Sequence, residues 1–275
     1  MTHFSLLLPT YGADDPEHLR RAFTSAVHDQ SRRPSEIVLV RDGPVPATLD
    51  RVLDELSASC PVALKRIDLD ENAGLGHALD AGLAVCSHEV VARMDSDDVS
   101  LPRRFEVQLP VIESGYDLVG SALLEFGADE DDIVGLRTPP LDEDDIKRWA
   151  RFADPFNHPT VVYRRSAVQA AGGYRDLPLL EDYWLFARMI DHGARVANVG
   201  EPLVKYRVGA GAFARRGGFD LLRSEILLQR EFRASGFVTR RQYLRNLAVR
   251  GGYRLVPEMV CRAAYGRLIA HRGER

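Results

Sequence analysis

The first part of the chain alternates short apolar runs with stretches in which apolar residues recur at helical spacing. Apolar runs with the length of buried strands lie at residues 4–8, 36–40 and 90–94, and residues 63–69, which mix apolar and charged residues, are a further candidate strand. Helical spacing follows Pro16 and recurs over residues 49–56 and 76–85. Strands that alternate with helices form a parallel sheet with right-handed crossovers. The pattern therefore predicts an α/β fold, with a mostly parallel sheet flanked by helices.

Three of these runs end in polar loops. The loops are Pro9-Thr10-Tyr11-Gly12, Arg41-Asp42-Gly43-Pro44 and Asp95-Ser96-Asp97-Asp98. In open α/β sheets, ligands bind just outside the carboxyl ends of the strands, and parallel strands bring those ends to one edge. We therefore expect a single pocket that offers an aromatic ring, polar groups and carboxylates.

The third loop is the most acidic. Its three carboxylates lie within four residues and repel one another unless water, a metal or basic side chains relieve the repulsion. Asp95, Asp97 and Asp98 therefore suit a cation site. A solvated acidic turn is the alternative.

Composition indicates a globular chain with unevenly divided charge. Of the 275 residues, 45% are hydrophobic and 28% charged, which is typical of a folded protein with a sizeable core. The net charge is −4, yet the chain from residue 215 onward holds fourteen arginines and five acidic residues. We expect an Arg-rich helical extension on an acidic body.

The basic extension admits two hypotheses. It places apolar residues between its arginines, namely Leu221, Leu222, Ile226 and Leu227. These residues suit either a helical cap packed on the main domain or a helix pair at an anionic membrane surface. A nucleic-acid partner is not expected, because no aromatic and basic pattern of a known binding module occurs.

Cysteine usage and apolar segments bear on location. Cys60, Cys86 and Cys261 match neither a zinc spacing nor a disulfide framework. The N-terminus lacks a basic leader, and no segment approaches the roughly 20 apolar residues of a membrane span. We therefore expect a cytoplasmic protein, peripheral at the inner face of the membrane if its extension binds lipid.

The three polar loops, in their order along the chain, resemble those of the family 2 glycosyltransferases, which have the Rossmann-like GT-A fold. The resemblance covers about residues 3–214 and is greatest for the branch that builds bacterial exopolysaccharides and capsules, in which Asp42-Gly43-Pro44 and Asn157-His158-Pro159-Thr160 have counterparts. It implies a catalytic domain over 1–214 and an extension over 215–275. It also implies inverting sugar transfer from a nucleotide-diphosphate sugar to a polysaccharide or lipid-linked glycan acceptor.

The resemblance assigns the donor site to loops near the sheet edge. The residues implied to bind the nucleotide are Pro9, Thr10, Tyr11, Asp42, Asn72, Asp95 and Arg207. Asp42 would accept the imide N–H of the base, which favours uracil or thymine, although guanine also offers an N–H.

The resemblance also implies Mn²⁺ or Mg²⁺. Asp97 would bind the cation that bridges the two phosphates, and Asp98 would support it or act as a second ligand. Oxygen ligands suit these hard cations better than zinc. Gly209 stands where many members have a histidine that completes the metal shell. Either Asp97, the phosphates and water suffice, or Arg207 and the arginines at 215 and 216 share the neutralisation.

Direct displacement at an anomeric carbon needs a base for the acceptor hydroxyl. Glu181 and Asp182 begin a stretch of helical spacing, where acidic residues are commonly dipole partners. The family carries its catalytic Asp in a Glu-Asp pair after a Gly-Gly-Tyr segment, here residues 172–174. The resemblance therefore assigns the base to Asp182, and donor or acceptor positioning to Glu181, Trp184 and His158. A hydrogen-bonded structural role is the alternative for His158.

Other function classes remain open on the sequence. Asp95 and Asp97 also fit a haloacid-dehalogenase-type phosphatase, which needs a catalytic lysine that neither Lys147 nor Lys205 clearly supplies. A nucleotidyltransferase usually begins with a glycine-rich basic loop, and Pro9-Thr10-Tyr11-Gly12 lacks that character. A non-catalytic nucleotide-sugar-binding protein is the third alternative.

Overall fold

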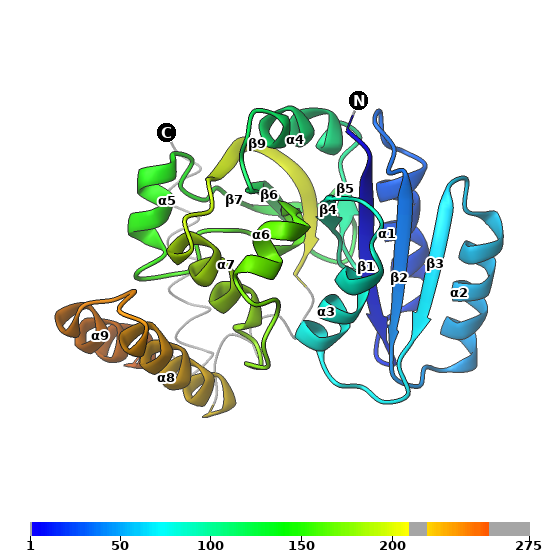
Figure 1. Cartoon of the computed structure of the whole chain (residues 1–275). Coiled ribbons are helices and arrows are strands. Elements are labelled where there is room, and N and C mark those ends of the chain that lie inside the picture. The colour runs from blue at the N-terminus through cyan, green and yellow to red at the C-terminus, as the bar shows by residue number, and fades with distance from the viewer. Residues whose placement is uncertain (1, 209–218, 253–275) are drawn as a thin grey trace.

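The computed structural model of the chain describes residues 2–208 and 219–252 (Figure 1). The strands are β1 (Phe4–Tyr11), β2 (Glu36–Asp42), β3 (Ala63–Asp68), β4 (Val90–Arg93), β5 (Val99–Ser100), β6 (Leu118–Phe126), β7 (Ile133–Arg137), β8 (Val162–Arg164) and β9 (Val196–Arg207). The helices are α1 (Pro16–Val27), α2 (Ala47–Ser59), α3 (Leu75–Val85), α4 (Arg104–Glu113), α5 (Glu143–Trp149), α6 (Arg165–Ala170), α7 (Glu181–Asp191), α8 (Phe219–Ala234) and α9 (Arg240–Asn246). A 3₁₀ turn, η1 (His158–Thr160), precedes β8, and a π-helical turn, η3 (Leu247–Gly251), follows α9.

The strands form one sheet in the order β3-β2-β1-β4-β8-β6-β9-β5, with β7 paired to β6 (Figure 1). The first half, β3-β2-β1-β4, is parallel, as the alternation of strands and helices predicts. The second half is mixed, because β8 runs antiparallel to both of its neighbours, β4 and β6. The predicted α/β class is therefore confirmed, and the antiparallel strands all lie in the part of the chain for which the sequence predicted no strand order.

Alternation along the strands divides the core into two layers. On β1, Leu7 faces one cluster of buried side chains, whereas Leu6 and Leu8 face the other. The first layer is covered by α3, α6 and α7, and the second by α1, α2 and α4. Side chains of a strand alternate between the faces of a sheet, so continuous apolar runs imply helices on both faces.

The direction of β8 brings a second set of residues to the carboxyl edge of the parallel strands. Tyr11 at the end of β1 pairs in register with Asp42 at the end of β2, and the last residue of β4, Arg93, pairs with Leu7 of β1. Because β8 runs the other way, its beginning lies at this edge, and the preceding turn η1 places His158 there. The pocket can therefore draw residues from both halves of the sheet.

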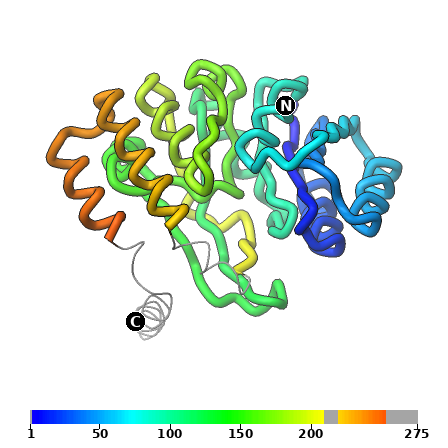
Figure 2. The backbone as a smooth tube through the Cα atoms, turned by 90° about the horizontal axis from the view of Figure 1, so that it is seen from below, coloured from blue at the N-terminus to red at the C-terminus, as the bar shows by residue number. Residues whose placement is uncertain are grey.

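The C-terminal helices pack on the main domain. Leu221, Leu228 and Phe232 of α8 belong to the same buried cluster as the residues of α7. The fully buried carboxylate of Glu225 accepts hydrogen bonds from Arg250 at 2.7 and 2.8 Å, which joins α8 to η3. Figures 1 and 2 place α8 and α9 at the end of the molecule opposite α2. This packing agrees with the hypothesis of a helical cap.

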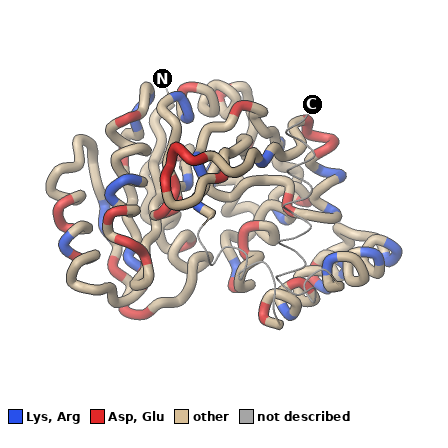
Figure 3. Tube along the Cα trace, turned by 180° about the vertical axis from the view of Figure 1, so that it is seen from behind, with Lys and Arg blue, Asp and Glu red and all other residues tan. Residues whose placement is uncertain are grey.

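The boundary proposed at residue 214 lies outside the described residues, as does the chain from 253 onward, so the division into 1–214 and 215–275 stays a prediction. Figure 3 shows several basic positions on the two C-terminal helices. No helix in the described part of the chain is long and apolar enough to span a membrane. Cys60 and Cys86 are free thiols.

Candidate active site

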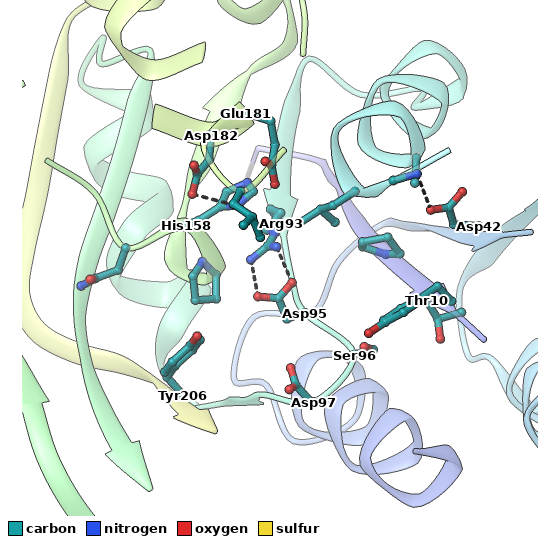
Figure 4. A pocket seen from close by; sticks show the side chains of 18 of the residues that line it. Thr10, Asp42, Arg93, Asp95, Ser96, Asp97, His158, Glu181, Asp182 and Tyr206 are labelled. Atoms are coloured by element: carbon teal, nitrogen blue, oxygen red, sulfur yellow. Dashed lines mark hydrogen bonds and ion pairs between the residues drawn. The ribbon is translucent and has the colours of Figure 1, made fainter. Parts of the chain in front are cut away.

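A cavity of about 690 Å³ opens at the carboxyl edge of the parallel strands. The loops after β1, β2 and β4 line one side of it, and η1 with the start of α7 lines the other (Figure 4). Leu221 of α8 also contributes to the wall. Of the predicted site residues, those that line it are Pro9, Thr10, Tyr11, Asp42, Asn72, Asp95, Asp97, His158, Glu181 and Asp182.

Asp14 ties two of the pocket loops together. Its Oδ2 accepts hydrogen bonds from Thr10 Oγ1 at 2.8 Å, from the Tyr11 N–H at 3.2 Å and from Ser96 Oγ at 2.6 Å. Burial raises the pKa of this carboxyl, and the three donors oppose that effect. The sequence analysis missed Asp14, because it directly precedes Asp15, the N-cap of α1. Its position after a strand, inside the pocket loop, is the available signal.

Asp42 holds another loop. Its two carboxylate oxygens accept hydrogen bonds from the backbone N–H groups of Ala73 and Gly74 at 2.9 and 3.0 Å. Gly74 has a φ of 94°, which a residue with a side chain rarely adopts. The contact joins the loop of Asp42 to the loop of Asn72, and the resemblance assigns both residues to the nucleotide. Each carboxylate oxygen has a second lone pair, so a base N–H remains a compatible partner, and the predicted role of Asp42 stays a prediction.

The acidic cluster after β4 is compact. One oxygen of each of Asp95, Asp97 and Asp98 lies within 4.8 Å of the others. Asp98 is fully buried, and its Oδ1 accepts a hydrogen bond from the Arg207 N–H at 2.9 Å. Its Oδ2 has no hydrogen-bond partner among the described residues. Burial and the two neighbouring carboxylates raise the pKa of Asp98 well above its usual range.

These observations fit a divalent cation. A buried carboxylate oxygen without a partner is costly, and a cation beside it would supply the missing interaction. The donor set contains only hard oxygen atoms, which suits Mg²⁺ or Mn²⁺. Asp97 faces the cavity, whereas Asp98 supports the cluster from behind it.

Arg93 is the counter-charge of this cluster. It lies on β4 with 1% of its side chain exposed, and its guanidinium forms a bidentate ion pair with Asp95, including Nη1 to Oδ2 at 2.6 Å. Figure 4 places it between the Asp95–Asp97 loop and the Glu181–Asp182 pair. The sequence analysis did not identify it as a site residue. A charged residue in the middle of an otherwise apolar strand is the signal that could have found it.

Arg207 lies behind the cluster. Its Nε donates to the Asp97 carbonyl at 3.0 Å, its Nη1 donates to the Ala128 carbonyl at 3.2 Å, and its guanidinium lies 4.5 Å from the centre of the Phe126 ring. It is not among the described residues that line the cavity. Gly209 and the arginines at 215 and 216 lie outside the described residues.

A second group of carboxyls faces the cluster across the pocket. Burial and the neighbouring Asp182 raise the pKa of Glu181 to about 7. Burial also raises the pKa of Asp182, with the charge of Arg93 opposing it. Burial and the charge of Asp182 raise the pKa of Asp154 well above its usual range. Asp154 was not predicted as a site residue, because it lies before the Asn157-His158-Pro159-Thr160 motif and has no motif of its own.

His158 contacts Asp182. Its Nδ1 lies 3.4 Å from Asp182 Oδ2, and its Nε2 lies 3.1 Å from the hydroxyl of Tyr174. Trp184 lies elsewhere. The guanidinium groups of Arg175 and Arg188 lie 5.4 and 5.2 Å from the centre of its ring, and it is not among the described residues that line the pocket. The structure thus brings His158, Glu181 and Asp182 together at the pocket, whereas Trp184, which was predicted with them, lies outside it.

Solved structures with this architecture define the class of protein. The fold is similar to that of an S. aureus TarS fragment in complex with UDP-GlcNAc, with a TM-score of 0.63 and 18% identity over 84% of this chain and 66% of that one. It is also similar to the mannosyltransferase PcManGT from Pyrobaculum calidifontis in complex with GDP-Man and Mn²⁺, with a TM-score of 0.64 and 14% identity over 97% of this chain and 80% of that one. The protein therefore has the GT-A fold of glycosyltransferases.

Sequence comparison gives the family. The glycosyl transferase family 2 model matches residues 5–172. The chain is 39% identical over 267 residues to the amylovoran biosynthesis glycosyltransferase AmsE of Erwinia amylovora, which covers 95% of this chain and 97% of that protein. It is 31% identical over 256 residues to the UDP-Gal:alpha-D-GlcNAc-diphosphoundecaprenol beta-1,3-galactosyltransferase of Escherichia coli, with 92% of each chain covered. The chain belongs to glycosyl transferase family 2, and the resemblance on which the site prediction rests is confirmed.

The raised pKa of Glu181 predicts a pH-dependent loss of stability. In the folded protein Glu181 keeps its proton up to about pH 7, whereas its ordinary pKa is 4.5. The contribution of Glu181 to the free energy of unfolding is therefore complete below pH 4.5 and is lost as pH rises through 7. Glu181→Gln cannot ionise. We expect the variant to gain up to about 3 kcal/mol relative to the wild type between pH 4.5 and 8, measured by urea unfolding. Glu231→Gln, at an exposed position of α8, is the control, and equal pH slopes for Glu181→Gln and wild type would contradict the prediction.

Proposed function

We propose that this protein is a metal-dependent inverting glycosyltransferase that uses a nucleotide-diphosphate sugar. The observation that carries the proposal is the division of one cavity into two acidic sides, with Asp97 on one and Asp182 on the other. A cation-binding cluster suits a diphosphate leaving group, and a buried carboxylate opposite it suits an attacking hydroxyl.

The donor side would bind the nucleotide through the loops that Asp14 and Asp42 hold in place. Tyr11 is the exposed ring at the end of β1, and it suits stacking on a base. A cation held by Asp97 and Asp98 would neutralise the diphosphate as negative charge builds up on it. A pyrimidine nucleotide is favoured, because the carboxylate of Asp42 can accept the imide N–H.

On the acceptor side, Asp182 would take the proton of the acceptor hydroxyl. The hydroxyl oxygen forms a bond to the anomeric carbon while the bond from that carbon to the phosphate oxygen breaks, and the nucleoside diphosphate leaves with the bonding electrons. A single displacement of this kind inverts the configuration of the anomeric carbon. Burial raises the pKa of Asp182, which makes its carboxylate a stronger base.

The acceptor is proposed to be a polysaccharide or a lipid-linked glycan, as the names of the two relatives indicate for those proteins. Such a reaction uses cytoplasmic nucleotide sugars, and we propose a cytoplasmic location. A haloacid-dehalogenase-type phosphatase is less compatible with the site. Both oxygens of Asp95, its required nucleophile, are paired with Arg93, and no lysine lines the cavity in the described part of the chain.

We further propose that the outer face of α8 touches the membrane that carries a lipid-linked acceptor. Phe219, Arg223, Leu227 and Arg230 are exposed and recur at helical spacing on one face, opposite the buried residues of α8. Exposed arginines next to apolar side chains suit an anionic lipid surface.

Donor binding should depend on Asp97. With Mn²⁺, we expect one pyrimidine nucleoside diphosphate to raise the thermal midpoint of the wild type by about 5 °C at a concentration well above its Kd. EDTA and Asp97→Ala should each abolish this rise. A panel of UDP, dTDP, GDP and ADP identifies the base, and no rise with any of them would argue for a phosphatase or a non-catalytic protein.

Transfer should depend on Asp182. Asp182→Asn cannot accept the proton, so we expect transfer to fall by about 10²- to 10⁴-fold while the thermal rise with nucleotide and Mn²⁺ is kept. Asp191→Asn, at the exposed end of the same helix, should transfer normally. Normal turnover by Asp182→Asn would show that the base is another group.

Membrane contact should depend on the arginines of α8. We expect the double variant Arg223→Glu, Arg230→Glu to bind anionic phosphatidylglycerol vesicles at least about 30-fold more weakly, since each basic residue contributes ~1 kcal/mol. Arg51→Glu on α2, an exposed arginine far from α8, is the control in the same co-sedimentation assay. Unchanged binding by the double variant, or no binding by the wild type, contradicts the proposal.

A further inference from the structure

A line of three polar side chains runs from the pocket into the core. Asp182 lies at the pocket, His158 Nδ1 is 3.4 Å from its Oδ2, and the Tyr174 hydroxyl is 3.1 Å from His158 Nε2. The side chain of Asp182 is 20% exposed and that of His158 is 8% exposed. Only Asp182 therefore has substantial access to a substrate, and His158 and Tyr174 can affect the reaction only through Asp182.

The surrounding structure fixes the histidine ring. It packs edge-on against Phe186, with ring centres 5.7 Å apart. Its turn is anchored two residues later, where Thr160 Oγ1 donates to the Asn157 carbonyl at 2.8 Å. Tyr174 is buried and follows a glycine pair whose φ angles of 81° and 65° lie in the left-handed region. Its backbone N–H donates to Asp80 Oδ1 at 3.2 Å, which anchors the segment that carries the hydroxyl.

When Asp182 is ionised, as its role as a base requires, the protonation states of the three groups are consistent with one arrangement. Burial and the charge of Arg93 lower the pKa of His158 well below its usual range, so the ring is neutral, with one donor and one acceptor nitrogen. Burial raises the pKa of Tyr174, which keeps its hydroxyl able to donate. An ionised Asp182 can only accept. The proton of the imidazole therefore belongs on Nδ1, and Nε2 accepts from Tyr174.

We propose that His158 is a positioning residue for the base, donating Nδ1–H to Asp182, and that Tyr174 selects this tautomer by donating to Nε2. The inference rests on the proposed function, in which Asp182 is the base. The Tyr183 N–H already donates to Asp182 Oδ1 at 2.7 Å, so the histidine would hold the second oxygen and fix the plane of the carboxylate.

Other charged groups around Asp182 do not replace this donor. Arg93 on β4 is engaged by Asp95, and its charge acts on Asp182 from a distance. The remaining titratable groups that face Asp182 are Glu181 on α7, Asp154 before η1, Asp95 after β4 and Tyr174. The three carboxyls oppose its ionisation. In the described structure, the neutral Nδ1–H of His158 is the side-chain donor that can stabilise the ionised form of Asp182 without adding a charge.

The pH profile of transfer separates this role from a structural one. Asp182 must be ionised to act, so activity falls as pH falls through its pKa. In His158→Phe the donor is lost, and we expect the acid limb of kcat/KM to move up by about one pH unit, so that activity at pH values below the wild-type limb falls about 10-fold. His158→Asn, which places an N–H near the Nδ1 position, should restore most of the profile. An unmoved acid limb in His158→Phe would overturn the proposal.

A matched control tests whether loss of any buried hydroxyl has the same effect. Tyr183→Phe removes a hydroxyl that donates to the Ala150 carbonyl at 2.7 Å, away from the pocket, and keeps the backbone N–H. We expect it to lower the thermal midpoint without moving the acid limb. A shift of the limb as large as that of His158→Phe would assign the effect to general loosening and overturn the proposal.

A measurement without substrate keeps the inference independent of the proposed function. Nitrogen NMR of the ¹⁵N-labelled protein distinguishes the two imidazole tautomers, and the His158→Asn spectrum assigns the signal. We expect the proton on Nδ1 in the wild type and a mixture of tautomers in Tyr174→Phe. A proton on Nε2 in the wild type overturns the proposal. If the wild type transfers no sugar, the proposed function fails, and this spectrum alone decides the role of His158.

Discussion

One buried positive charge allows two acidic groups to share a cavity. Arg93 has almost no contact with water, forms a bidentate pair with Asp95, and acts electrostatically on Asp182 across the pocket. Without a fixed guanidinium, the repulsion among the carboxyls and the cost of burying them would favour protonation or unfolding. The other carboxyls that surround the pocket are Asp97, Asp98, Asp154 and Glu181.

The parallel half of the fold is readable from the sequence, because β1, β2 and β4 are mostly apolar runs and a helix follows each of β1, β2 and β3. The four predicted strands and the three helices between them form as expected. The antiparallel half gives weaker signals. Strand β8 has three residues and β5 has two, and each is defined by partners far away in the chain, β4 and β9. A run that short has no periodicity of its own, so its pairing depends on tertiary contacts.

The pocket loops and the Glu-Asp pair were identified from ordered motifs, and the structure brings most of them to one cavity. Arg93, Asp14 and Asp154 were missed for a common reason. Each acquires its meaning from a partner in space that the sequence does not reveal, as Asp14 does from Ser96. Trp184 illustrates the converse, since the resemblance assigned it to the pocket whereas its ring contacts two arginines away from it.

The reversed strand β8 has a consequence for how such enzymes diversify. The side of the cavity that we propose binds the nucleotide comes from residues 9–97 and the opposite side mostly from residues 137–182, so the two proposed recognition surfaces occupy consecutive blocks of the gene. Recombination at a point between the blocks, or insertion in the loop that follows β7, can exchange one recognition surface while the other is inherited intact. Because β8 is reversed, recombination between these two blocks can join an existing donor-binding half to a different second half, and new sugar linkages can arise in this way.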